Sequence, residues 1–232
     1  MRERPSSPSS TARQTTLSVD IVVLTPRAKR LAVLVAKAPD THSRERWILP
    51  WDAPRGEESL ADAAARVARA ALGTAPAALE QIAAFGDNRR HPGDAELSVG
   101  FFALMPNGDY LPSGSESTWF DAEELPAVFP RQRAIIDAAF DAVRARLDQS
   151  PLAFRLLPPT FTLSELQAVY EILLGRRLHK ASFRRALQAA YLVEPTDEWR
   201  SEGRGRPAQL FRYAPRKRRD RRRGVRFDLV SG

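Results

Sequence analysis

Residues 150–215 of the chain carry start and stop signals for two closely spaced helices. Thr162 and Glu165 have the spacing of a capping box, so a helix should begin at Thr162. Gly175 is the residue type that most often ends a helix, and a second helix with an apolar stripe is expected at about residues 180–190. Two short apolar runs then flank a polar, glycine-rich loop. This order of helix, turn, helix, strand, loop and strand is that of a winged helix-turn-helix.

The basic charge of the chain is concentrated in the same region. The 232 residues have a formal net charge of +8, but residues 1–150 hold 18 Lys and Arg against 20 Asp and Glu. Residues 151–232 hold 18 basic and 8 acidic residues, and an excess of ten over six remains when only residues 151–215 are counted. A soluble protein with such a one-sided excess usually meets a polyanion, most commonly nucleic acid. We therefore expect double-stranded DNA to be a partner of the C-terminal part.

The second helix should enter the major groove, because the first turns of a recognition helix face the base edges. Phe183, Leu187 and Ala190 lie on its opposite stripe and are expected in the core. Arginine can bond guanine with two hydrogen bonds, whereas the start of the first helix should contact phosphate. The arginines of the glycine-rich loop could follow the DNA backbone or enter a minor groove. Each arginine alone also fits a solvated surface charge, but the set favours DNA contact. The predicted DNA-binding residues are Thr162, Ser164, Lys180, Ser182, Arg184, Arg185, Arg204 and Arg206.

The N-terminal part alternates short apolar runs with two helical segments, which predicts an α+β domain. Ser59 should cap a helix that Gly73 ends, and residues 130–147 form a longer amphipathic helix. A stiff, proline-containing connector at residues 150–159 should join this domain to the winged helix. The expected organisation is a disordered arm at residues 1–16, an effector-sensing and dimerisation domain at 17–149, a winged helix at 150–215 and a basic tail at 216–232.

Composition excludes several classes of protein. The chain contains no Cys, so it has no disulfide framework, no thiolate zinc site and no cysteine nucleophile. His42, His91 and His179 are scattered without ligand spacing, and we therefore expect no metal site and no cofactor. No apolar run approaches the ~20 residues that span a bilayer, and the polar N-terminus has no signal-peptide core. These features predict a cytoplasmic protein without a membrane partner.

Residues 49–73 resemble the Nudix box, the loop and helix that hold the metal ions of Nudix hydrolases. Glu58 fills the first Glu of that pattern, Arg66 fills its Arg, and Gly73 fills its final Gly. Residues 119–126, Trp-Phe-Asp-Ala-Glu-Glu-Leu-Pro, resemble a second Nudix landmark. The resemblance implies a Nudix-like α/β/α sandwich for the N-terminal part. Without the second landmark, the helix would also fit an ordinary alanine-rich packing helix.

The departures from the box concern its carboxylates. An intact box places three carboxylates on one helix face, where they bind divalent cations that polarise a diphosphate and activate water. The equivalent positions are Val67, Ala70 and Ala71, and Asp52 stands at the leading Gly. Because a hard cation needs several oxygen ligands, the remaining Glu58 cannot form the site alone. We therefore expect no catalytic residue, no metal and no enzyme activity in this domain.

Residues 154–171 closely resemble the start of the C-terminal domain of the Nudix-related transcriptional regulators. Residues 182–185 and 205–212 match that family as well, although Ser182 stands where the family usually has Asn. The resemblance covers about residues 17–213 and implies a Nudix-like domain followed by a winged helix. It also implies a homodimer that binds palindromic operators and responds to nucleotide-type effectors such as ADP-ribose.

Residues and resemblance together predict a DNA-binding transcriptional regulator whose inactive Nudix-like domain senses a nucleotide-like small molecule; repression and activation both stay open. Trp47, Trp51 and Phe85 could stack on the base of such an effector, with Glu58 and Arg66 as further ligand residues; the aromatic residues also fit the core of a small domain. Two alternatives stay open. One is an active Nudix pyrophosphohydrolase with a basic nucleic-acid-binding appendage, and the other is a Nudix-like domain that serves only as a dimerisation scaffold.

Overall fold

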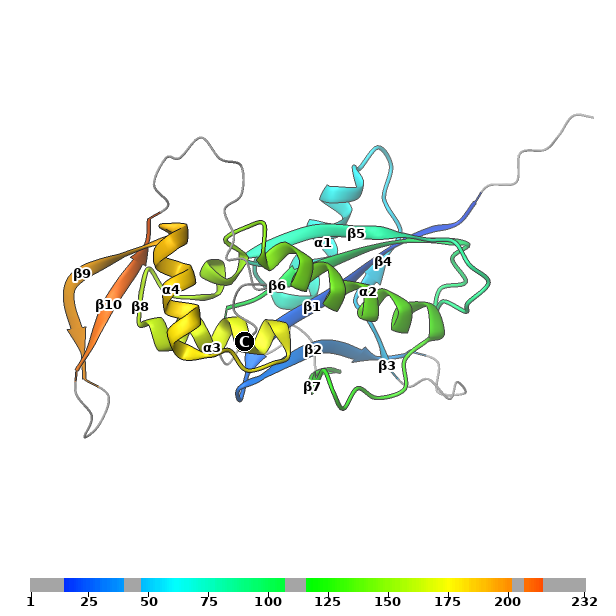
Figure 1. The fold of residues 1–232 in the computed structure, drawn as a ribbon. Coiled ribbons are helices and arrows are strands. Elements are labelled where there is room, and N and C mark those ends of the chain that lie inside the picture. The colour runs from blue at the N-terminus through cyan, green and yellow to red at the C-terminus, as the bar shows by residue number, and fades with distance from the viewer. Residues whose placement is uncertain (1–14, 40–46, 107–115, 202–206, 215–232) are drawn as a thin grey trace, which may run out of the picture.

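The computed structural model describes residues 15–39, 47–106, 116–201 and 207–214. The expected disordered arm, the basic tail and the wing residues Arg204 and Arg206 lie outside the described residues. Two units follow each other along the described chain, an α/β/α sandwich and a winged helix (Figure 1). Among the described helices, none combines the length and the hydropathy of a membrane span.

A seven-stranded mixed sheet forms the middle layer of the sandwich. Its strands are β1 (Leu17–Arg27), β2 (Arg30–Lys37), β3 (Trp47–Ile48), β4 (Trp51–Asp52), β5 (Ala78–Phe85), β6 (Leu97–Leu104) and β7 (Ser117–Asp121). The main order is β3-β2-β1-β6-β5, with β4 paired to β1 and β7 paired to β2. The central strand β1 runs parallel to β6 and antiparallel to β2 and β4. Because β1 is covered on both faces, residues 18–26 are all buried, and residues 21–24 form a continuous apolar run.

One helix covers each face of this sheet. Helix α1 (Leu60–Leu72) shares an apolar cluster with Ile21 and Val23 of β1, whereas α2 (Pro130–Leu147) shares another with Val22 and Leu24. The alternation arises because successive side chains of a strand point to opposite faces. Sites carried by α1 and by α2 are therefore separated by the sheet.

The winged helix has the predicted order of elements, with a short strand added before its first helix. It comprises β8 (Thr160–Phe161), α3 (Leu163–Leu174), α4 (Lys180–Ala190), β9 (Val193–Arg200) and β10 (Ala208–Tyr213). The strands form an antiparallel sheet in the order β8-β10-β9. The capping box is confirmed, because Thr162 Oγ1 accepts a hydrogen bond from the Glu165 N–H and Glu165 Oε2 accepts one from the Thr162 N–H. Gly175 ends α3 with a φ of 69°.

The proline-containing connector between the two units includes a short helix that the sequence analysis did not predict. Residues Leu152–Leu156 form a 3-10 helix, η1, in which every side chain except that of Arg155 is buried. The Phe154 ring packs against Phe161 and Tyr213, with centroid distances of 5.8 and 4.6 Å. One apolar core therefore continues from α2 through η1 into α3 and α4. Buried apolar side chains, rather than prolines, fix the two units to each other.

Candidate functional site

Helix α4 separates its apolar and polar side chains as a recognition helix should. Phe183 and Leu187 are 0% and 1% exposed, as predicted, and the Phe183 ring packs edge-on against Tyr170 of α3. The third predicted core residue, Ala190, is only half-buried because α4 ends there.

The opposite face of α4 carries positive charge toward solvent. Lys180, Arg184 and Arg185 are exposed, and Ser182 is half-buried. The ion pairs that the described part of this unit contains join Arg177 to Glu171, Arg200 to Glu165 and Arg212 to Glu194. They leave the three cations on α4 available to a polyanion.

Two polar residues of α3 hold the turn in front of α4. Glu171 Oε1 accepts a hydrogen bond from the Leu178 N–H at 2.9 Å, and Gln167 Nε2 donates to the Leu178 carbonyl at 3.0 Å. Gln167 also donates to Glu171 at 2.9 Å. This arrangement fixes the start of α4 relative to α3. The sequence analysis missed both residues, although their i,i+4 spacing on a helix next to a turn was visible.

The structure engages Thr162 in the cap of α3, and its predicted contact with DNA stays a prediction. Its hydroxyl and its N–H are both engaged by Glu165, whose carboxylate adds negative charge at the start of α3. Arg200 donates to the same carboxylate at 2.7 Å. Ser164 lies exposed in the first turn of α3, so its backbone contact to phosphate stays a prediction.

Two exposed residues beside this surface were not among the predicted contacts. Gln188 is exposed one turn beyond Arg184, and glutamine can bond adenine with two hydrogen bonds. Trp199 is 58% exposed near the end of β9. The helical spacing of Arg184 and Gln188 could have indicated the first, whereas Trp199 gave no separate sequence signal because a polar stretch surrounds it.

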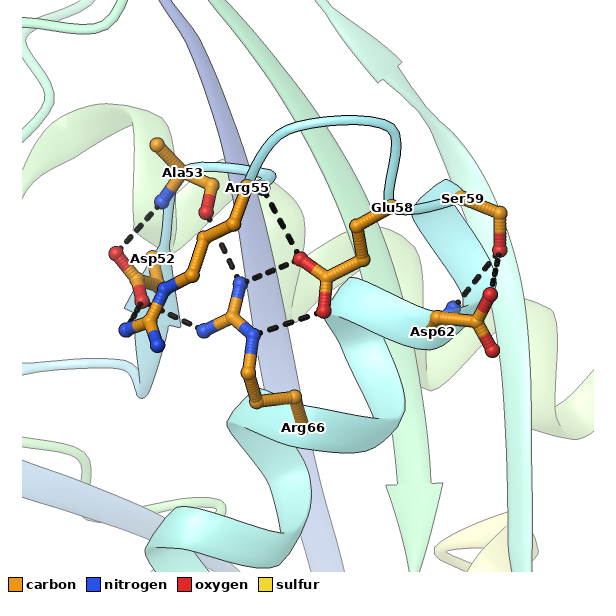
Figure 2. Close-up of polar contacts among 7 residues, drawn as sticks. All are labelled: Asp52, Ala53, Arg55, Glu58, Ser59, Asp62 and Arg66. Carbon is orange, nitrogen blue, oxygen red and sulfur yellow. Dashed lines mark hydrogen bonds and ion pairs between the residues drawn. The ribbon is translucent and has the colours of Figure 1, made fainter.

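In the Nudix-like domain, Arg66 occupies the centre of an ion-pair cluster (Figure 2). Its Nε and one terminal nitrogen donate to the two oxygens of Glu58 at 2.9 and 2.8 Å. Its other terminal nitrogen donates to Asp52 at 2.6 Å, and Arg55 donates to the same Asp52 oxygen at 2.7 Å. Ser59 caps α1 as predicted, since its hydroxyl accepts a hydrogen bond from the Asp62 N–H.

The cluster holds its carboxylates in the charged state. Hydrogen bonds from Arg66 lower the pKa of Glu58. Burial raises the pKa of Asp52, but the hydrogen bonds from Arg66 and Arg55 outweigh burial and leave this pKa below its ordinary value. Hydrogen bonding to Glu58 in turn raises the pKa of Arg66. The carboxylates therefore neutralise arginines within the domain.

The three box positions that lack carboxylates also offer no other ligand. Val67 is buried in the core, Ala71 is half-buried, and Ala70 faces solvent. Among the described residues there is no group of three or more His, Cys, Asp or Glu side chains that could hold a metal ion.

The structure does not bring the five predicted effector residues together. Glu58 and Arg66 lie on the α1 side of the sheet, whereas Trp47 and Phe85 pack against the core on the α2 side. Trp47 contacts the Phe120 ring edge-on, with a centroid distance of 4.9 Å. Trp51 contacts the buried His91 ring, with a centroid distance of 4.8 Å. The aromatic residues are thus engaged within the protein, and a role in effector binding stays a prediction.

Comparison with known proteins agrees with both units. A model of the NUDIX domain matches residues 14–139, and a model of the NrtR DNA-binding winged helix domain matches residues 153–213. The ADPR responsive transcriptional repressor NtrR of Acinetobacter baylyi is 30% identical over 206 residues, which are 85% of this chain and 82% of the relative. These matches confirm the resemblance that the residues suggested.

Solved structures show the same arrangement. Shewanella oneidensis NrtR complexed with a 27mer DNA has a TM-score of 0.72 at 30% identity, over 86% of this chain and 94% of that chain. A MutT/nudix family protein from Enterococcus faecalis has a TM-score of 0.70 at 21% identity, over 88% and 89% of the two chains. The second likeness concerns the fold alone.

Proposed function

Because this chain belongs to the NrtR family of Nudix-domain transcriptional regulators, we propose that it is a transcriptional repressor whose DNA binding responds to ADP-ribose or a related nucleotide. The winged helix binds operator DNA, and the Nudix domain binds the effector. The protein acts as a homodimer, so that two recognition helices meet the two halves of a palindromic operator.

The observation that carries this proposal is the exposed basic face of α4. Lys180, Arg184 and Arg185 project from a helix whose other face is locked into the core by Phe183 and Leu187. The hydrogen bonds of Gln167 and Glu171 fix the start of that helix. A rigid helix with an unneutralised basic face is what sequence-specific DNA binding requires.

The Nudix domain of this protein does not hydrolyse diphosphates. Hydrolysis would require several oxygen ligands around divalent cations, and Glu58 and Asp52 are engaged by Arg66 instead. Metal-dependent turnover of ADP-ribose above ~1 per second would contradict this and favour the alternative of an active pyrophosphohydrolase.

Effector binding reaches the DNA-binding unit through the shared apolar core. Helix α2 covers the Nudix sheet and continues into η1, and η1 packs on α3. A change in the Nudix domain can therefore shift the spacing of two recognition helices, which must match half-sites about 34 Å apart.

The deciding experiment is DNA binding of the full-length protein with and without ligand. Genomic footprinting of the purified protein supplies the operator, and fluorescence anisotropy then measures its affinity at increasing ADP-ribose, NAD and ADP. Calorimetry of each nucleotide with and without operator must show the same coupling factor from the other side. A nucleotide that binds equally well in both states is no effector. If no nucleotide binds, the Nudix domain is only a dimerisation scaffold.

A further inference from the structure

The turn between β1 and β2 places three basic side chains near the helix-turn-helix. Arg27, Lys29 and Arg30 are all exposed there, although they belong to the Nudix domain. Ala28 and Lys29 have φ angles of 47° and 66°, the backbone of a two-residue hairpin turn that favours Asn and Gly. The chain thus keeps a lysine at a position where glycine would suit the backbone better.

A cleft separates this turn from the residues that precede the recognition helix. The cleft has a volume of about 740 Å³, and its lining includes Lys29 and Arg30 from the Nudix domain and Arg176 and Arg177 from the winged helix. Arg176 and Arg177 are exposed between α3 and α4. In Figure 1 the β1–β2 turn and the start of α4 point to the same edge of the molecule. Basic residues thus lie on both sides of the cleft, whose lining also includes Asp121, Glu123, Asp137 and Glu171.

The charges at the turn are only partly neutralised. Arg30 lies 2.9 Å from Asp121 and 3.5 Å from Glu123. The ion pairs between described residues do not include Arg27 or Lys29. Arg27 and Lys29 therefore carry positive charges that no carboxylate in the described part of the chain neutralises.

We propose that Arg27 and Lys29 contact the phosphate backbone of DNA beside the segment that α4 reads, so that the Nudix domain is part of the DNA interface. This inference rests on the proposed DNA-binding function. Backbone contacts need positive charge and reach rather than a shaped pocket, and both side chains are exposed and uncompensated. A small anion inside the cleft is less favoured, because the lining residues Arg30 and Arg177 already pair with carboxylates.

This arrangement would give the effector a second way to change the affinity of the protein for DNA. The Nudix turn and the winged helix would touch the same duplex from two units. A change in their relative orientation would then break contacts of one unit while the other stays bound.

The test compares two double variants that remove the same charge. Arg27→Gln/Lys29→Gln alters the turn, and Lys37→Gln/Arg69→Gln removes two exposed charges from the far end of β2 and from α1. Affinity for a mixed-sequence duplex of about 40 base pairs is measured between 50 and 200 mM salt, roughly the range over which phosphate contacts show their salt dependence. Each lost phosphate contact should flatten the log–log slope by about 0.9, so the turn variant should lose about 1.8 per bound protomer. Its affinity near 0.1 M salt should fall at least about tenfold, and the control should stay close to wild type.

Folding is controlled by a third variant. Lys29→Gly removes one charge and suits the positive φ, so its melting temperature should not fall. It should still flatten the salt slope by about 0.9.

Proximity is tested with a single introduced thiol, which is unique because the chain contains no Cys. On a duplex that carries the footprinted operator, an iron chelate attached to Lys29→Cys should cleave the DNA backbone next to the footprinted segment, and the same chelate on Lys37→Cys should not. Equal loss of affinity in both double variants, or an unchanged slope in the turn variant, would overturn the inference and leave the winged-helix function standing. If the chelate on Lys29→Cys does not cleave DNA, and inorganic diphosphate raises the melting temperature of the wild type but not of the turn variant, the cleft binds a small anion instead. If the wild-type protein binds no duplex, the proposed function and the inference fail together.

Discussion

The two helices that carry arginines at the candidate sites, α1 and α4, use the same residue type in opposite ways. On α1, Arg66 lies against Glu58 and Asp52, and its charge is neutralised within the domain. On α4, Arg184 and Arg185 face solvent and pair with no described residue. The difference shows that charge alone does not mark a binding surface, because a neutralised arginine holds a loop together and an unneutralised one can meet a ligand.

Within the segment that resembles the Nudix box, two groups of residues also differ in their structural role. The Glu–Arg pair of the Nudix box keeps a structural role, since it fastens the loop at residues 52–58 to α1. The ligand positions Val67, Ala70 and Ala71 have no such role in holding that loop. In the winged helix, by contrast, α4 carries both the buried residues that hold it in place and the exposed residues predicted to contact DNA.

The largest effect is expected for the buried side of α4. Phe183→Ala removes a fully buried ring that packs on Tyr170, and it should lower the free energy of unfolding by about 3–5 kcal/mol. DNA binding should be lost with it, because α4 would no longer be held against α3. Denaturant unfolding measures the change in stability, and fluorescence anisotropy measures the DNA affinity. Intact DNA binding in this variant would break the division of α4 into a core face and a DNA face.

The exposed side of α4 should show the reverse behaviour. Arg184→Ala and Arg185→Ala should each weaken binding to the footprinted operator by about 1–3 kcal/mol if the side chain reads a base, with no change in melting temperature. Arg155→Ala, exposed on η1, serves as the matched control. An equal loss on operator and on mixed-sequence DNA would mean that these arginines hold phosphate and carry no sequence information.

The third prediction concerns Thr162, which the structure assigns to helix capping. Thr162→Ala should lower the free energy of unfolding by about 1 kcal/mol, whereas Thr162→Ser should retain the cap. The salt dependence of DNA binding should be the same in both variants. A flatter salt dependence in the alanine variant alone, at equal stability, would support Thr162 as a phosphate contact.

The smallest effect is expected at Arg66. Arg66→Met should lower the melting temperature slightly at neutral pH and leave DNA affinity unchanged, because partly exposed ion pairs contribute little. The pKa values of Glu58 and Asp52 are lowered in the folded state, so the contribution of these carboxylates is present above their ordinary range near 4 and is lost as the pH falls through the lowered values. The difference between wild type and variant should therefore shrink below about pH 4. Arg69→Met on the same helix is the control, and a gap that widens in acid would contradict the assignment.

Much of the fold follows from local signals in the sequence. The boundaries of α2 and α4 agree with the predicted ones, and both predicted glycines end their helices in the left-handed region. Strand β9 extends to Arg200, further than its apolar residues indicated, because pairing with β10 stabilises a polar strand that faces solvent on one side. Sequence periodicity detects burial, and a largely exposed strand leaves little of that signal.

The candidate sites divide in the same way. The exposed cations of α4 followed from helical spacing, because the residues between them had to enter the core. The capping-box spacing predicted the interaction between Thr162 and Glu165. Only the two hydrogen bonds show that the hydroxyl and the N–H of Thr162 are both already engaged. The separation of Trp47 and Phe85 from Arg66 depends on which face of the sheet each one occupies.

The sequence by itself determined the two units, their order and the helix ends, and it predicted the loss of the metal-binding carboxylates. Each of these depends on residue identity and on neighbours within a few positions, which caps and periodicity record directly. Only the tertiary structure decided that Arg66 is neutralised, that η1 joins the two units through one core, and that the β1–β2 turn shares a cleft with the turn between α3 and α4. These features join residues that are far apart along the chain. Their contacts depend on the packing of the whole molecule, and no local pattern in the sequence encodes them.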